Sequence, residues 1–203
     1  MMRTPGSVER KGRGDHRANL GMPAAAIRFA RDNAEDGQSA PGETAPVLLL
    51  GLGNPLMADD GAGQELLSRL TPEASGWGPQ VEFVDGGTQG LALMGVLEGR
   101  KAVVFLDAIQ LGDKPGAVHV LNGEELMGMG ARPAMTAHEG SAPQILAALE
   151  LLGEAPKEIR MIGIEPERVG LGIGLSTAVR ASLGLAATFA KVAVNQFIGS
   201  LVP

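Results

Sequence analysis

Three side chains that can bind a divalent metal stand in three separate stretches of the chain. Asp60 ends the run GLGNPLMADD (51–60), Asp107 follows the apolar run 103–106, and His138 lies in the stretch MTAHEG (135–140). Carboxylate and imidazole groups supply the oxygen and nitrogen ligands that suit divalent metal ions. The three positions therefore indicate a metal-facing cluster.

Two further carboxylates have a structural interpretation beside a chemical one. Asp59 comes just before a predicted helix, where a carboxylate caps free amide groups and complements the helix dipole, and the same interpretation applies to Asp60. Asp85 comes before two glycines, so it either accepts hydrogen bonds inside a tight loop or takes part in catalysis, or does both. Asp107 ends a buried strand, where an unsatisfied carboxylate is costly, and this favours a functional role.

A repeating strand and helix pattern must position these residues. Several of the apolar runs are apolar on both faces, as strands covered by helices on each side should be. The expected fold is a three-layer α/β/α sandwich around a mixed, mostly parallel five-stranded sheet. Strands are predicted at 47–50, 81–84, 102–106, 117–121 and 159–164, and helices at 62–70, 91–97, 143–152 and 176–201.

The connections between these elements predict where the polar residues meet. The loop between strands 102–106 and 117–121 is too short for a crossover helix, so these two strands are expected to pair antiparallel. Ligands of parallel sheets bind at the carboxyl ends of the strands. Asp60, Asp85 and Asp107 follow three different strands, and His138 precedes the helix at 143, so all four are expected at one edge of the sheet.

The chain divides into an extension and one domain. Residues 1–45 are rich in Gly, Pro, Arg, Ser and Asp and poor in large apolar side chains, so we expect a mostly disordered extension in which 24–31 can form a short helix. Residues 46–203 are expected to form the single folded domain.

Composition excludes several classes of function. The chain has no cysteine, so it has no thiolate metal site, disulfide or cysteine nucleophile. Residues 1–45 hold 7 basic and 6 acidic side chains and residues 46–203 hold 10 and 17, so the domain is acidic and nucleic acid is not an expected partner. No membrane association is expected either, because neither a membrane-length apolar run nor a signal peptide is recognisable, and we expect a cytoplasmic protein.

Other catalytic and binding motifs fit poorly. The Gly51-Leu52-Gly53 turn lacks the third glycine of a dinucleotide fingerprint, because position 56 is leucine. His138-Glu139 lacks the second histidine of a zinc protease helix, because position 142 is alanine, and Ser141 is not in a nucleophile elbow. His119 and His16 are interpreted as structural or incidental.

The ordered series of motifs at 51–63, 85–88, 107–109, 138 and 162–166 resembles that of the nickel-iron hydrogenase maturation endopeptidases, over residues 46–190. The resemblance implies a peptidase that removes a C-terminal extension from the hydrogenase large-subunit precursor after nickel insertion. It implies a metal-binding trio of Asp60, Asp107 and His138, with nickel carried by the substrate. It also implies that Asp85 helps to bind or orient the substrate tail. Many relatives have glutamate where this chain has Asp60.

The resemblance leaves the water-activating group open between the metal and a carboxylate, Asp60 or Asp85. Substrate choice is expected in the loops around Gln89, 127–136 and 166–176. Peptidyl-tRNA hydrolase, which shares the GLGNP start, fits poorly because the chain has no tyrosine and is acidic. A binding module that docks a nickel-loaded precursor without cutting it remains an alternative.

Overall fold

A six-stranded sheet forms the centre of the computed structural model, which describes residues 27–29, 44–129 and 142–201. The strand order is β1-β3-β2-β4-β6-β5, and every neighbouring pair is parallel except β5 with β6. The strands are β1 (Arg28–Phe29), β2 (Val47–Leu52), β3 (Val81–Gly87), β4 (Ala102–Ala108), β5 (Val118–Asn122) and β6 (Glu158–Ile164).

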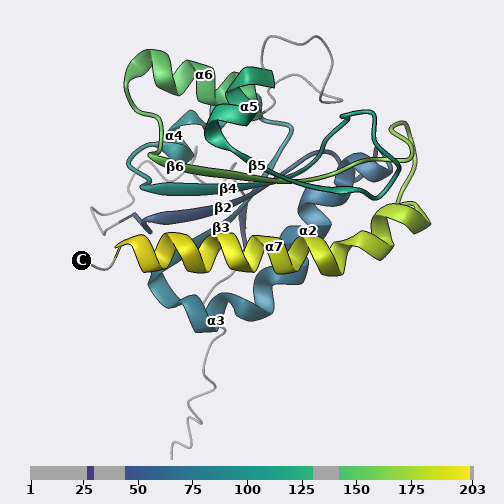
Figure 1. Cartoon of the computed structure of the whole chain (residues 1–203), viewed down its shortest axis with the longest axis horizontal. Helices are drawn as coiled ribbons and strands as arrows, with labels where there is room; N and C mark the ends of the chain where they lie inside the picture. The colour runs from purple at the N-terminus through teal and green to yellow at the C-terminus, as the bar shows by residue number, and fades with distance from the viewer. Residues whose placement is uncertain (1–26, 30–43, 130–141, 202–203) are drawn as a thin grey trace, which may run out of the picture.

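Helices cover both faces of the sheet (Figure 1). One face carries α2 (Ala62–Leu70), α3 (Ala74–Trp77) and α7 (Thr177–Leu201), and the other carries α4 (Met94–Leu97), α5 (Gly123–Met129) and α6 (Ala142–Leu152). The 3-10 turns are η1 (Asp59–Gly61), η2 (Thr71–Glu73), η3 (Gly78–Gln80) and η4 (Gly90–Leu93). The predicted three-layer α/β/α architecture is confirmed.

Two hydrophobic cores form because successive side chains of a strand point to opposite faces. Leu49 of β2 packs in the core that includes α2 and α7, whereas Leu48 and Leu50 pack in the core that includes α4 and α6. All six residues of β2 are buried. Burial on both sides explains why its sequence is continuously apolar rather than alternating.

The position of β5 differs from the prediction. The strand is antiparallel, as expected, but its partner is β6 and not β4. β6 lies between the two, and its residues 161–164 are buried, whereas the residues of β5 are partly buried or, at Val120, exposed. The half-exposed sequence of β5 suits the edge of the sheet.

A further strand, β1, comes from the predicted extension. Its residues 28 and 29 pair with Val84 and Asp85 of β3, so they are strand where a short helix was considered. The remaining residues of 1–45, apart from 27, 44 and 45, lie outside the described residues.

Helix α7 is the one helix of the described residues whose length and apolar composition would suit a membrane span. Its buried residues are mostly small and medium-sized apolar side chains that pack in the core shared with α2. They are Val179, Leu183, Ala186, Ala187, Ala190, Ala193, Val194 and Phe197. A helix that covers the middle of a sheet needs this composition for packing alone.

Candidate active site

The first turn of α2 lies directly on the carboxyl ends of β2 and β4. A Cβ atom added at Gly63 would lie 2.2 Å from the carbonyl oxygen of Leu52 and 2.3 Å from that of Leu106. Asp60 precedes Gly63 by three residues, and Asp107 follows Leu106 directly. The close contact therefore brings these two predicted metal ligands to one edge of the sheet, where they are 2% and 1% exposed.

Asp60 is held by the loop that follows β2. Its Oδ2 accepts a hydrogen bond of 2.8 Å from the backbone N–H of Asn54. The Oδ1 of Asn54 in turn accepts a bond of 3.0 Å from the N–H of Leu56, and Gln64 donates to the carbonyl of Gly53. The Asp60 carboxylate therefore binds the backbone of the loop that carries it.

Ala58, just before the two aspartates, has an unusual backbone. Its φ of 55° lies in the left-handed region, which costs a non-glycine residue about 1–3 kcal/mol. Its N–H donates to the carbonyl of Gly172 at 2.8 Å, and its carbonyl accepts from Gly61 at 3.1 Å. These two hydrogen bonds hold the backbone of Ala58 in its strained conformation. Strain of this kind is characteristic of functional sites.

Asp59 connects two loops. Its Oδ2 accepts bonds from the N–H groups of Glu167 (2.9 Å) and Arg168 (3.1 Å), and its Oδ1 accepts one of 2.6 Å from Ser176. The prediction that it caps α2 is wrong, since its partners lie between β6 and α7, 108 to 117 residues away. Asp59 ties that loop to the loop carrying Asp60.

Asp85 accepts a hydrogen bond of 3.0 Å from the N–H of Gly87 through Oδ1, which confirms its predicted role within the turn. Its strand register places it beside Gly51, which also pairs with Leu106 of β4. Leu106 packs on the α2 and α7 face, so Asp85, at the same register position, lies on that face too. Asp107 is the next residue of β4 after Leu106, and because successive side chains of a strand alternate, it lies on the face of α4, α5 and α6. The catalytic role of Asp85 stays a prediction.

The third predicted ligand, His138, lies outside the described residues. Within the described ranges no group of three His, Asp or Glu side chains is placed to hold a metal. Asp107 lies on the face that α6 covers, and α6 begins at the buried Ala142, four residues after His138. The predicted trio therefore stays a prediction, with two of its members at the same sheet edge.

Sequence reasoning did not assign a role to Glu165, at the end of β6. Its carboxylate is buried and accepts bonds from the N–H groups of Leu111 (2.8 Å) and Gly112 (3.1 Å). The Nε2 of His119 lies 3.5 Å from Glu165 Oε2, so the interpretation of this histidine as structural is consistent with its surroundings. Glu165 therefore fixes the loop between β4 and β5, and its place before Pro166 at a strand end was the available signal.

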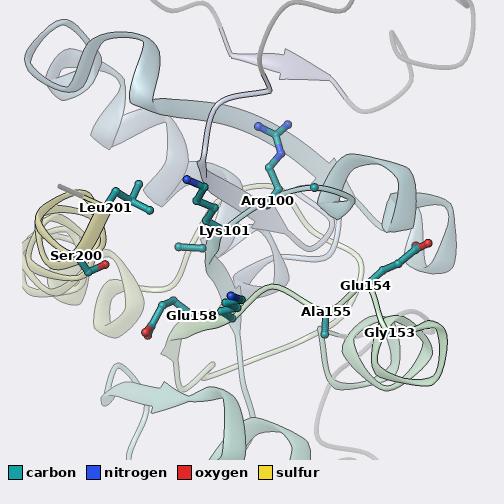
Figure 2. A pocket seen from close by; sticks show the side chains of 11 residues that line it. Arg100, Lys101, Gly153, Glu154, Ala155, Glu158, Ser200 and Leu201 are labelled. Carbon is teal, nitrogen blue, oxygen red and sulfur yellow. The ribbon is translucent and has the colours of Figure 1, made fainter. Parts of the chain in front are cut away.

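A pocket of about 620 Å³ lies at the other end of the sheet (Figure 2). It is lined by residues at the start of β4 and β6 and at the end of α7, among them Lys101, Glu158 and Leu201. Asp107 follows Ala102 by five residues along β4, a distance of roughly 16 Å at the usual strand rise. This pocket is not part of the candidate site.

Comparisons with known proteins agree on one family. The family model for hydrogenase maturation protease (HycI) matches residues 63–191. The hydrogenase expression/formation protein HupD of Rhodobacter capsulatus is 32% identical over 141 residues, covering 69% of this chain and 67% of that protein. Hydrogenase 2 maturation protease of Escherichia coli K12 is 31% identical over 138 residues, covering 68% and 83%. The solved structure of the hydrogenase maturating endopeptidase HybD from E. coli matches with a TM-score of 0.65 at 29% identity, covering 74% of this chain and 92% of that one.

Proposed function

The chain belongs to the hydrogenase maturation protease family, and from this membership we propose that it is an endopeptidase that removes the C-terminal extension of a nickel-loaded hydrogenase large-subunit precursor. The observation that carries the proposal is the pair of buried carboxylates, Asp60 and Asp107, at the joined ends of β2 and β4. Two buried carboxylates at one sheet edge carry negative charge that a cationic ligand would compensate, which supports the proposal.

The proposed ligand is the nickel that the precursor carries, with Asp60, Asp107 and His138 as the residues that contact it. Two carboxylates and one imidazole fit the ligand preferences of nickel. Three protein ligands leave room for groups of the precursor around the same ion. In this proposal the protein recognises a substrate whose nickel is already in place.

Hydrolysis adds water across the scissile peptide bond. Bound nickel would supply Lewis acidity to polarise the scissile carbonyl, and the Asp60 carboxylate would take a proton from the attacking water. The C–N bond then breaks, the proton passes to the leaving amine, and the products are a new carboxylate and a new amine. Asp85, at the end of β3, orients the departing C-terminal tail in this scheme.

The test is the intact mass of a large-subunit precursor, nickel-loaded or nickel-free, after incubation with the protein. We expect loss of a C-terminal fragment from the loaded precursor only. Asp107→Asn and His138→Ala should each slow cleavage by at least 100-fold, the order of magnitude of a lost electrostatic contact to the reacting group. Asp113→Asn is the matched control, because Asp113 is an exposed carboxylate in the loop after β4.

If the precursor mass is unchanged but a stable complex forms, the proposed peptidase activity is refuted. That result would support a binding module that docks the nickel-loaded precursor without cutting it. Cleavage at the wild-type rate by Asp107→Asn would refute the ligand assignment while leaving the peptidase activity intact.

A further inference from the structure

Three large apolar side chains project into solvent from two neighbouring loops at the active-site edge. Leu56, in the loop between β2 and η1, is 60% exposed, and Leu171 and Ile173, in the loop between β6 and α7, are 94% and 86% exposed. We call these three side chains the loop patch. Leu171 and Ile173 have the largest and third-largest exposures among the exposed large hydrophobic residues of the described chain.

The two loops are joined by backbone hydrogen bonds. The N–H of Gly172 donates to the carbonyl of Leu56 at 3.0 Å, and the carbonyl of Gly172 accepts from Ala58 at 2.8 Å. Leu171 and Ile173 flank Gly172, so the same bonds hold their backbone beside the loop that carries Leu56. The side chains are therefore exposed by an ordered backbone arrangement.

Asp59 holds the loop between β6 and α7 in this position. Its carboxylate binds the N–H groups of Glu167, Arg168 and Ser176, which stand at the two ends of the loop that carries the patch. Asp59 is also the neighbour of Asp60. The loop that carries the patch is thus hydrogen-bonded to the residue that precedes the candidate catalytic Asp60.

We propose that the loop patch is the docking surface for an apolar surface of the hydrogenase large-subunit precursor next to its scissile segment. The proposal rests on the proposed function, which requires a protein substrate to be held beside Asp60. The size of the patch supports this occupant over a second copy of the chain. Three side chains fall far short of the roughly 1,600 Å² of a stable interface, whereas a few exposed apolar residues can dominate a transient contact.

The pattern of the second loop supports the same assignment. Leu171 and Ile173 alternate with glycines in the sequence GLGIG (170–174), and a Cβ atom at Gly170 would meet nothing within 4 Å. Within the described residues, the space on the Cβ side of Gly170 is therefore open. Small residues between large ones let a partner approach the backbone closely while the large side chains enter its surface.

The experiment compares the double variant Leu171→Ser/Ile173→Ser with a matched control, Leu151→Ser/Leu152→Ser. The control residues end α6 and are 88% and 59% exposed, so they remove similar apolar surface away from Asp60. The dissociation constant for nickel-loaded precursor is measured by biolayer interferometry, and KM and kcat by intact mass. We expect the patch variant to raise the dissociation constant and KM by about 10- to 100-fold with kcat within about twofold, and the control to match wild type.

Wild-type values of both constants in the patch variant would overturn the proposal. So would a wild-type dimer in sedimentation velocity that the patch variant abolishes, because the occupant would then be a second copy. If the unmodified protein binds the precursor without cutting it, the proposed peptidase fails, but the dissociation constants still decide the docking surface.

Discussion

Replacing Gly63 by alanine is expected to separate α2 from the sheet. The added Cβ would lie 2.2 Å and 2.3 Å from the carbonyl oxygens of Leu52 and Leu106 and 2.9 Å from the nitrogen of Leu52. All three atoms belong to the backbone of central strands. The helix must therefore move by about 0.8 Å to restore even a 3.0 Å contact, and no side-chain rotation can relieve the clash.

The free energy of unfolding should fall by about 3 kcal/mol, the upper part of the range for overpacked cores, since two strands are affected at once. For a domain of this size that corresponds to a melting temperature lower by about 6–12 °C. Cleavage of the precursor should fall as well, because the same contact sets the position of the loop with Asp60 relative to the end of β4.

Gly184→Ala in α7 is the control, because its Cβ would meet only the end of the Arg69 side chain, at 4.0 Å. Alanine is a better helix former than glycine by about 0.5–1 kcal/mol, so this variant should be slightly more stable than wild type. Both variants are measured by thermal unfolding followed by circular dichroism. If Gly63→Ala were as stable as Gly184→Ala, the inferred close contact between α2 and the strand ends would be wrong.

Two further substitutions test other contacts. Asp59→Asn should lower the free energy of unfolding by about 2–4 kcal/mol in a urea titration, because an amide offers one acceptor oxygen to three N–H donors. An unchanged urea midpoint would show that Asp59 does not hold the β6–α7 loop. Arg100→Lys should lower the free energy of unfolding by about 2 kcal/mol. The guanidinium of this nearly buried residue binds Glu82 and the carbonyls of Val96 and Ala45, and one lysine ammonium cannot make the same three bonds. Retained stability would indicate that these three bonds contribute little.

The strand sequences were sufficient to predict the layered architecture. Residues 48–50 and 103–106 are apolar at every position, and this pattern requires cover on both faces of a strand. Short elements such as α3 and α5 were not predicted, because helices of four and seven residues are stabilised by tertiary packing rather than by their own periodicity.

The candidate site was predictable only in part. Carboxylates that follow apolar runs are visible in a sequence, and for Asp60 and Asp107 the parallel sheet then implies a shared edge. The partners of Asp59 were not predictable, because they lie more than 100 residues away. The signal in its own neighbourhood favoured a helix cap.

By itself, the sequence determined the fold class and the carboxylates at the strand ends, since local patterns record which residues must be buried. Only the tertiary structure decided that β6 separates β4 from β5, that Asp85 and Asp107 lie on opposite faces, and that Leu171 is exposed beside Leu56. These features depend on strand order, register and contacts between distant loops. They follow from the packing of the whole chain and are not encoded in any one segment.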